Sequence, residues 1–230
     1  MISKMNDLWT RWYEQKGLKN VESRSGDTST LKSTTRLRKA LPRLLHKFGV
    51  KTLFDAPCGD LNWMREVLKE VDIDYVGADI VVPMIEQLKA DQELGRRAKF
   101  FVLDLTRDPL PPADLMLARD FLFHLSFEHT LDFLRNFAAS DIRYLLTTSH
   151  INDGTFENHD IPTGRFRKID LFQPPYNFPS DTVDQILDGK NDRYLYLWTR
   201  AQIADACEQF RSARSANAQV SHSDAPAAAS

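Results

Sequence analysis

The chain has 230 residues, of which 42% are hydrophobic and 27% charged, and its formal net charge is −2. This composition is that of an ordinary soluble globular protein, and the length suits one large domain with small additions. The near-neutral charge argues against binding of nucleic acid and against a polybasic membrane patch. Two cysteines, Cys58 and Cys207, do not make a disulfide framework, which favours a reducing cytoplasm. The N-terminus lacks the apolar core of a signal peptide, and no apolar run approaches membrane-spanning length.

The N-terminal stretch predicts an amphipathic helix followed by a polar loop. Apolar side chains at helical spacing form one stripe, made of Met5, Leu8, Trp9, Trp12 and Tyr13. Such a stripe suits a helix docked on the main domain, a lid over a pocket or the contact of a dimer. Residues 22–35 are rich in Ser and Thr, which favours either a linker or a loop that closes over a site. We therefore treat residues 1–30 as an addition to a main domain.

That main domain spans residues 31–211 and opens with a predicted helix that Gly49 ends. Its apolar stripe consists of Leu37, Leu41, Leu44, Leu45 and Phe48. Pro42 should kink this helix or begin a fresh first turn. At the other end of the chain, residues 212–230 are small and polar, and this composition predicts a disordered tail.

Residues 52–61, with the sequence TLFDAPCGDL, organise the rest of the chain. A short apolar run ends on Asp55, a turn containing Gly59 follows, and Asp60 can cap an amphipathic helix over residues 61–71. A buried strand, a turn with Gly and a helix start form the first βα unit of a nucleotide-binding sheet. Ligands in such sheets sit outside the carboxyl ends of the strands, so we interpret Asp55 as a ligand contact.

After this unit the pattern of strand and helix repeats. Further strands are predicted over residues 75–80, 99–105, 114–119, 144–150, 166–172 and 193–198, and helices over residues 82–94, 127–139 and 182–188, with a last helix capped by Thr199. The alternation of strands with helices predicts an α/β fold whose sheet is mostly parallel and carries helices on both faces. Right-handed crossovers then place the carboxyl ends of the parallel strands on one edge.

Four strands in succession deliver an acid to that edge: Asp55, Asp79, Asp104 and Asp120. One acid after a strand is weak evidence, because Asp is common in turns and at helix N-caps. Four in a row are harder to obtain from turn chemistry alone. Crowded like charges disfavour ionisation unless a cation or a hydroxyl-rich ligand meets them. A ligand with ribose hydroxyls, an adenine amino group and a positive charge would suit them.

The segments LFDAPCGDLNW, YVGADI, FFVLDLTRDPLPPADLMLARD and YLLTTSH, in this order and spacing, resemble the successive motifs of class I S-adenosylmethionine-dependent methyltransferases. The resemblance covers residues 31–206 and is closest to a subgroup with a D-x-P-C-G-D turn. It implies a Rossmann-like sheet of seven strands, of which the last two form a hairpin and one is antiparallel to the rest. It also implies S-adenosyl-L-methionine as cofactor. With a balanced surface charge, a small molecule is the expected methyl acceptor, through O- or N-methylation.

The resemblance assigns roles to the residues at the edge of the sheet. Asp79, with Ile80 beside it, would hold the two ribose hydroxyls, and Asp104 with the backbone of Leu105 would face the adenine edge. The methionine end of the cofactor would meet the turn made of Asp55, Ala56, Pro57, Cys58 and Gly59. The commonest turn of the family has three glycines, whereas Pro57 and Leu61 replace the outer two here. Gly59 still permits a close approach of the backbone to a ligand.

Methyl transfer depends mainly on alignment of the reacting atoms and on exclusion of water. Arg119 and Asp120 would lie near the sulfonium and the transferred methyl. A hydroxyl or a protonated amine as acceptor also needs a base. His124 is the first candidate, because the spacing of four residues can place it on one face of a helical turn with Asp120; packing beneath the cofactor is its alternative role. His150 is the second candidate. The histidines show no paired spacing for a metal site.

Residues 151–165 are polar and stand where the family has a helix, so we expect an active-site loop there. Its candidates for substrate recognition are His150, Asn158, His159, Asp160 and Arg165; a solvated connection is the alternative.

Two other classes of function remain open. An NAD(P)-dependent oxidoreductase would share the sheet, but it should show G-x-G-x-x-G, which DAPCGDL lacks. A non-catalytic binding protein could keep the fold without the reaction.

Overall fold

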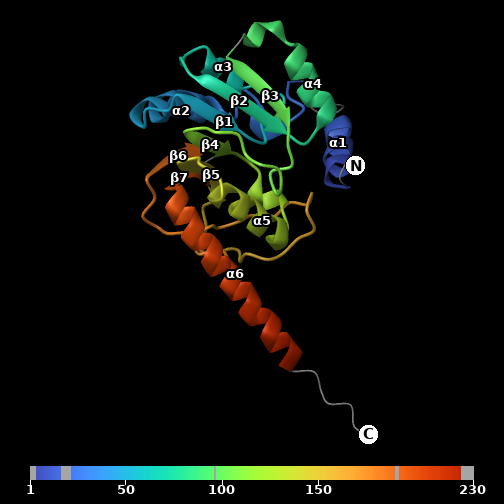
Figure 1. Ribbon diagram of the computed structural model, residues 1–230, viewed down its shortest axis with the longest axis vertical. Coiled ribbons are helices and arrows are strands. Elements are labelled where there is room, and N and C mark those ends of the chain that lie inside the picture. The colour runs from blue at the N-terminus through green and yellow to red at the C-terminus, as the bar shows by residue number, and fades with distance from the viewer. Residues whose placement is uncertain (1–3, 17–21, 96, 190–191, 224–230) are drawn as a thin grey trace.

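The structure is a computed structural model and describes residues 4–16, 22–95, 97–189 and 192–223. Within these residues one sheet of seven strands forms the centre, in the order β3-β2-β1-β4-β5-β7-β6 (Figure 1). The strands are β1 (Thr52–Asp55), β2 (Asp74–Asp79), β3 (Ala98–Val102), β4 (Leu115–Ala118), β5 (Tyr144–His150), β6 (Asp184–Asp188) and β7 (Arg193–Thr199). β7 runs antiparallel to both of its neighbours, and the other six strands share one direction. The predicted Rossmann-like sheet with an antiparallel hairpin is confirmed.

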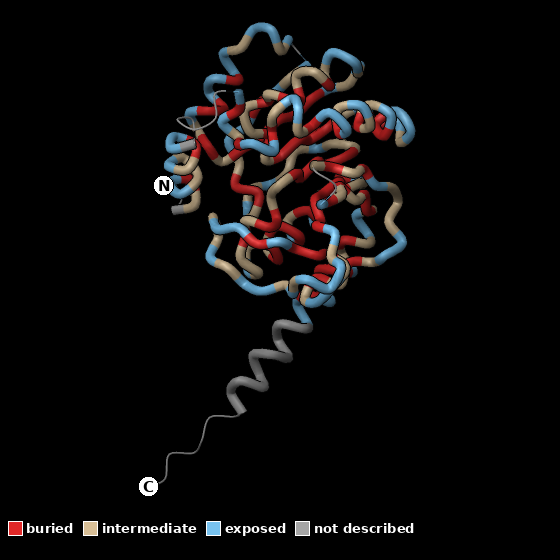
Figure 2. The backbone as a smooth tube through the Cα atoms, turned by 180° about the vertical axis from the view of Figure 1, so that it is seen from behind, coloured by how far each residue is buried: buried red, intermediate tan, exposed pale blue. Residues whose placement is uncertain are grey.

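The helices are α1 (Lys4–Lys16), α2 (Thr35–Lys47), α3 (Met64–Leu68), α4 (Val82–Ala90), α5 (Phe127–Ala138) and α6 (Arg200–Ser223), with short 3-10 turns η1 (Asp27–Ser29), η2 (Gln92–Leu94) and η3 (Leu122–His124). None of the helices in the described ranges combines the length and the apolar character needed to cross a bilayer. Buried backbone runs through the centre of the molecule, and the exposed backbone lies mainly in the outer helices and loops (Figure 2).

Two buried clusters flank the sheet, and alternate residues of β1, β2, β4, β5 and β7 enter different clusters. Leu53 packs in a cluster that includes Leu41 of α2, whereas its neighbour Phe54 packs in a cluster that includes Phe133 of α5. All four of these side chains are fully buried. Because successive side chains of a strand point to opposite faces, the alternation follows from the pleat. Burial of each such side chain contributes about 1.5–3 kcal/mol to folding.

The first helix after β1 is shorter than predicted, and Asp60 does not cap it. Residue Trp63 occupies the N-cap position of α3 and makes no side-chain cap. Leu61 has a φ of 60°, a left-handed conformation that cannot continue into a right-handed helix, so the turn extends further than the sequence indicated. α2 runs unbroken across Pro42, so the predicted fresh first turn is not formed.

Two predicted elements near the C-terminus are wrong. Residues 182–188, predicted as a helix, contain β6, which pairs with β7. Residues 166–172, predicted as a strand, form no ladder; Leu171 instead donates its N–H to the hydroxyl of Ser149. Short apolar runs do not distinguish a strand from a helix by their spacing, and the partner strand decides.

The last helix begins as predicted. Thr199 accepts a hydrogen bond from the backbone N–H of Gln202 at 3.2 Å, and the Gln202 side chain accepts one from the Thr199 N–H at 2.9 Å. This reciprocal pair is a capping box. α6 continues to Ser223, whereas the composition predicts disorder from Ser212 onward. The remainder of the predicted tail, residues 224–230, lies outside the described residues.

Candidate functional site

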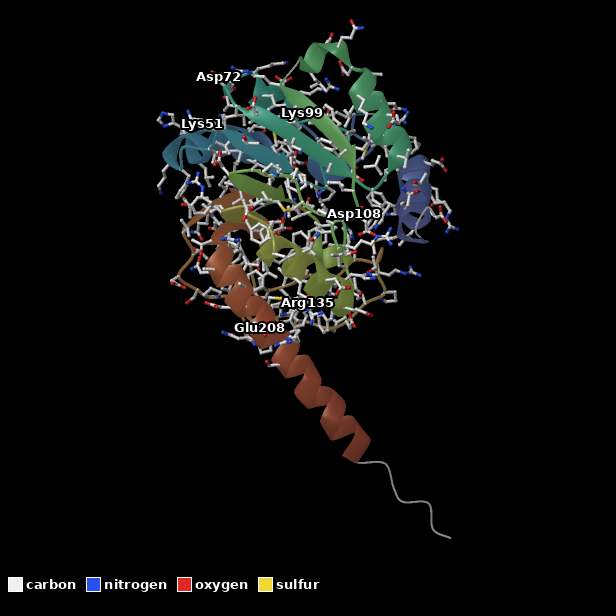
Figure 3. All side chains as sticks on the ribbon, viewed as in Figure 1. Lys51, Asp72, Lys99, Asp108, Arg135 and Glu208 are labelled. Atoms are coloured by element: carbon white, nitrogen blue, oxygen red, sulfur yellow. The ribbon has the colours of Figure 1, made fainter. Side chains whose placement is uncertain are left out.

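A cavity of about 370 Å³ lies at the carboxyl edge of the parallel strands. The chain leaves β1 toward β2 and β3 on one side and returns to β4 on the other, so β1 and β4 flank the point where strand order reverses. Lys51 and Asp72, which precede β1 and β2, lie across the sheet from Asp108, which follows β3 (Figure 3). α1 lies beside α4, at the same end of the molecule as Asp108 (Figures 1 and 3). The cavity therefore occupies the position at which open α/β sheets bind ligands.

The structure brings the four predicted acids together. Asp55, Asp79, Asp104 and Asp120 all line the cavity, and the first three are buried. Among the residues that the structure describes, no group of three or more His, Cys, Asp and Glu side chains is arranged to hold a metal ion. The lining thus concentrates carboxylates from four neighbouring strands in one space.

Burial changes the protonation of two of these acids. The Tyr75 hydroxyl donates to Asp55 Oδ2 at 2.7 Å, but desolvation dominates and raises the pKa of Asp55 to about 7. Desolvation also raises the pKa of Asp79 to about 6, although the N–H groups of Val81 and Gly59 donate to its two oxygens at 3.1 and 3.2 Å. A cation in the cavity would favour the ionised form of both carboxyls.

The turn after β1 is held rigidly between the neighbouring strands. Ala56 donates its N–H to the carbonyl of Leu117 in β4, and Cys58 donates its N–H to the carbonyl of Ala78 in β2. Pro57, Cys58 and Gly59 line the cavity, whereas Ala56 is fully buried behind them. Burial raises the pKa of the Cys58 thiol well above its ordinary value, which makes it a poor nucleophile.

Gly59 is required by its surroundings as well as by its φ of +58°. A Cβ at this position would lie 2.2 Å from the Ser25 hydroxyl oxygen. That hydroxyl donates to Asp60 Oδ1 at 3.0 Å and accepts from the Asp60 N–H at 2.9 Å, and the Arg24 N–H donates to Asp60 Oδ2 at 2.6 Å. Asp60 therefore fastens residues 23–25 onto the turn, and Ser25, Asp27, Thr28 and Ser29 form a wall of the cavity.

On the far side of β2, the residues expected to meet an adenine ring also line the cavity. Ile80, Asp104 and Leu105 are all part of the lining. The Asp104 carboxylate accepts hydrogen bonds from the N–H and the hydroxyl of Thr106 at 3.1 and 2.6 Å. The carbonyl of Leu105 accepts from the side chain of Asn136 at 2.9 Å. These bonds fix the loop after β3 in place.

A ring of ion pairs contains Asp120 and includes two residues that the sequence pattern did not reveal. Arg119 contacts Asp120 at 3.2 Å and Asp188 at 2.9 Å, and Arg193 contacts the same two carboxylates at 3.2 Å each. Burial opposes ionisation of Asp120, but the two guanidinium groups lower its pKa. Asp188 ends β6 and Arg193 begins the antiparallel β7, so both lie at the carboxyl edge of the sheet. Correct assignment of β6 as a strand would have revealed both.

His124 lies in η3 and lines the cavity together with Asp120. Its Nδ1 lies 2.8 Å from the carbonyl oxygen of Arg165. A carbonyl can only accept a hydrogen bond, so Nδ1 carries the proton and the lone pair of the neutral ring is on Nε2. The backbone thus selects the tautomer in which Nε2 is the basic atom.

His150, the second candidate base, is buried and does not line the cavity. Its Nδ1 accepts a hydrogen bond from the Ile169 N–H at 3.2 Å, and its ring packs against Phe123 and Phe166. Burial and the charge of Arg193 lower its pKa. The geometry gives it a packing role and gives no support to proton transfer.

The predicted recognition loop does not reach the cavity with the side chains singled out from the sequence. Asn158 donates to the carbonyls of Asp170 and Pro174 at 2.8 Å, and Asp160 accepts from the Phe127 N–H at the start of α5. His159 and Arg165 are exposed and are not part of the lining. The loop contributes indirectly, because Phe166 follows it and does line the cavity.

Comparison with known proteins identifies the fold. No protein-family model matches the chain, and no curated protein matches its sequence. Solved structures do match. The O-methyltransferase family 2 protein from Planctomyces limnophilus DSM 3776, in complex with apigenin, aligns with a TM-score of 0.59 and 16% identity over 86% of this chain and 62% of its own. Magnesium protoporphyrin IX methyltransferase from Synechocystis PCC 6803, with bound SAM, aligns with a TM-score of 0.59 and 11% identity. The alignment covers 86% of this chain and 98% of that enzyme. The chain has a methyltransferase fold.

A third match, human N-acetylserotonin methyltransferase in complex with SAM, has a TM-score of 0.52 and 12% identity over 83% of this chain and 65% of its own. This chain therefore spans less than two thirds of the human enzyme and of the Planctomyces protein. At these identities the likeness concerns the fold, and the function has to be argued from the cavity.

Proposed function

We propose that the protein is an S-adenosylmethionine-dependent methyltransferase that acts on a small-molecule acceptor by O- or N-methylation. The observation that carries this proposal is the cavity at the strand-order reversal, lined by Asp55, Asp79, Asp104 and Asp120. Its residues fit the cofactor chemically, because carboxylates suit ribose hydroxyls, an amino group and a positive charge. Its volume of about 370 Å³ lies within the ordinary range for small-molecule sites. The matched structures with bound SAM support the same cofactor.

Each part of the lining has a proposed role. Asp79 holds the ribose hydroxyls with Ile80 beside it, and Asp104 and Leu105 face the adenine. The methionine end lies along the turn from Asp55 through Ala56, Pro57, Cys58 and Gly59. Gly59 lines the cavity, and Ser25 fills the place where a side chain at Gly59 would stand, so residues 23–25 pack directly against the turn. The reaction centre lies near Arg119 and Asp120.

S-adenosylmethionine supplies a methyl group on a positively charged sulfur, which is already a strong electrophile. The residues of this chain align the acceptor and exclude water. α1 covers the cavity with Met5, Trp9, Trp12 and Tyr13, and this position supports the lid interpretation of residues 1–30. His124 Nε2 takes the proton of the acceptor, and the ion-paired Asp120 beside it stabilises the imidazolium that forms.

We also infer three finer assignments. The sequence from Asp55 to Asp60, D-A-P-C-G-D, favours the subgroup named for that turn. The two buried clusters support helices on both faces of the sheet. Two free, buried cysteines support a cytoplasmic location.

The test is a comparison of S-adenosylmethionine with NADH by titration calorimetry. We expect S-adenosylmethionine to bind clearly more tightly, because the turn lacks the glycines of a dinucleotide site. Preferential binding of NADH would reverse the assignment. Incubation of metabolite extracts with radiolabelled methyl donor then separates an enzyme from a binding protein; binding of the donor without any transfer of label would favour the latter.

A further inference from the structure

The cavity has a second half whose chemistry differs from the acid-lined half. Its walls are aromatic rings that meet at His124, namely Trp9, Trp12, Phe123 and Phe166. The centroid of the imidazole lies 5.7 Å from Trp9, 6.3 Å from Trp12, 4.5 Å from Phe123 and 6.1 Å from Phe166. These separations are those of edge-to-face aromatic contacts. The proposed base is therefore set in the middle of an aromatic wall.

The wall is held in place by backbone hydrogen bonds. Gly164 donates its N–H to the carbonyl of His124 at 2.8 Å, and Arg167 donates its N–H to the carbonyl of Phe123 at 3.2 Å. The bond from His124 Nδ1 to the Arg165 carbonyl lies between these two. Three bonds thus tie η3 to residues 164–167, and they fix the ring of His124 and the backbone on either side of Phe166.

α1 supplies Trp9 and Trp12 to this half of the cavity. Asn6 donates a hydrogen bond to the carbonyl of Ile80 next to the proposed ribose site, and Tyr13 donates to the side chain of Gln87 at 3.3 Å. Trp9 and Trp12 are then presented to the cavity at partial exposure. Phe166 is 62% exposed, the largest exposure among the exposed large hydrophobic side chains of the described residues. Aromatic surface left open beside a cavity is suited to cover a ligand of matching shape.

We propose that this aromatic half is the acceptor subsite and that it takes a flat aromatic molecule carrying a ring hydroxyl; the inference rests on the proposed function. Rings that meet edge-to-face favour an aromatic guest over a saturated one of the same size. A neutral acceptor is favoured over a cation, because a cation would face the positive sulfur across the reacting methyl. The hydroxyl gives its proton to His124 Nε2, its oxygen bonds to the methyl carbon, and the electron pair of the broken carbon–sulfur bond stays on sulfur.

Matched probes test the subsite. Binding of 2-naphthol and of its saturated counterpart, decahydro-2-naphthol, is measured by calorimetry on the full-length protein saturated with S-adenosylhomocysteine and again without it. We expect 2-naphthol to bind about tenfold more tightly. Phe166→Leu should remove most of this preference. Phe101→Leu is the control, because Phe101 is 42% exposed but lies on β3 outside the cavity, and it should leave the preference unchanged.

Equal affinity for 2-naphthol and decahydro-2-naphthol would overturn the proposal. So would an equal loss of the preference for 2-naphthol in Phe166→Leu and Phe101→Leu. So would tighter binding of cyclohexylmethylammonium than of 2-naphthol, which would reassign the rings to a cation. Failure of the proposed function is a separate result, seen as absence of S-adenosylmethionine binding. In that case the naphthol comparison on the protein without cofactor still decides whether the aromatic half binds an aromatic guest.

Discussion

Asp55→Asn should remove a pH dependence of stability that the wild-type protein has near neutrality. Burial raises the pKa of Asp55 from 3.8 to about 7 in the folded protein, and in the unfolded chain it keeps its ordinary value. Between these values the folded state holds a proton that the unfolded state has lost. The free energy of unfolding therefore falls as pH rises through this window, and it levels off above about pH 7.

The size of the effect follows from the shift in pKa. Each unit corresponds to about 1.4 kcal/mol, so the complete cost of ionising Asp55 in the fold is about 4 kcal/mol. About 2–3 kcal/mol of this cost arises between about pH 5 and about pH 8. Asn has no charge, and its side-chain oxygen can still accept the hydrogen bond from Tyr75. The variant should thus be the more stable protein at about pH 8.

Urea denaturation of both proteins at these two pH values measures the effect. Asp114→Asn is the control: partial burial opposes ionisation, yet the N–H groups of Lys51 and Thr52 and the charge of Arg143 lower the pKa of Asp114. Asp114 is ionised at both pH values. Asp114→Asn should therefore lower the free energy of unfolding by the same amount at each pH. The reasoning is refuted if wild type and Asp55→Asn change by the same amount between about pH 5 and about pH 8.

Three further substitutions test the site. Asp79→Ala should weaken S-adenosylmethionine binding sharply, by about tenfold or more, because a charged hydrogen-bond partner of the ligand is lost; unchanged affinity in calorimetry, with far-UV circular dichroism retained, would contradict the ribose role. His124→Ala should lower turnover about a hundredfold or more with little effect on cofactor affinity, since a general base is lost; normal turnover would exclude it as the base. Gly59→Ala should destabilise the protein more than Gly49→Ala, because both residues have positive φ but a Cβ would contact Ser25 only at Gly59. The positive φ alone costs about 1–2 kcal/mol in either variant. Equal melting temperatures of the two variants would argue against the close contact with Ser25.

Local patterns in the sequence were sufficient for most of the architecture and for the acids of the site. The sequence pattern predicts β5 residue for residue, and it places Asp55, Asp79, Asp104 and Asp120 on one edge, where all four line the cavity. The physical reason is that a strand's burial and its terminal acid are both encoded within a few neighbouring residues. Once the parallel order is known, chirality alone brings the strand ends together.

The residues that were missed or misassigned depend on contacts between distant segments. Asp188 and Arg193 join the ion-pair ring only because β6 and β7 form a hairpin at the edge of the sheet. Asp60 accepts a hydrogen bond from the Ser25 hydroxyl instead of capping a helix. His150 is buried because its Nδ1 accepts a hydrogen bond from the backbone N–H of Ile169.

The sequence by itself determined the parallel sheet, the Gly59 turn and the row of acids, because period, turn chemistry and crossover handedness are local or nearly local properties. Only the tertiary structure decided that α1 lines the cavity and that His124 stands among aromatic rings with its lone pair on Nε2. Those features arise when segments more than 40 residues apart along the chain, such as those of His124 and Arg165, form hydrogen bonds that no spacing in the sequence encodes.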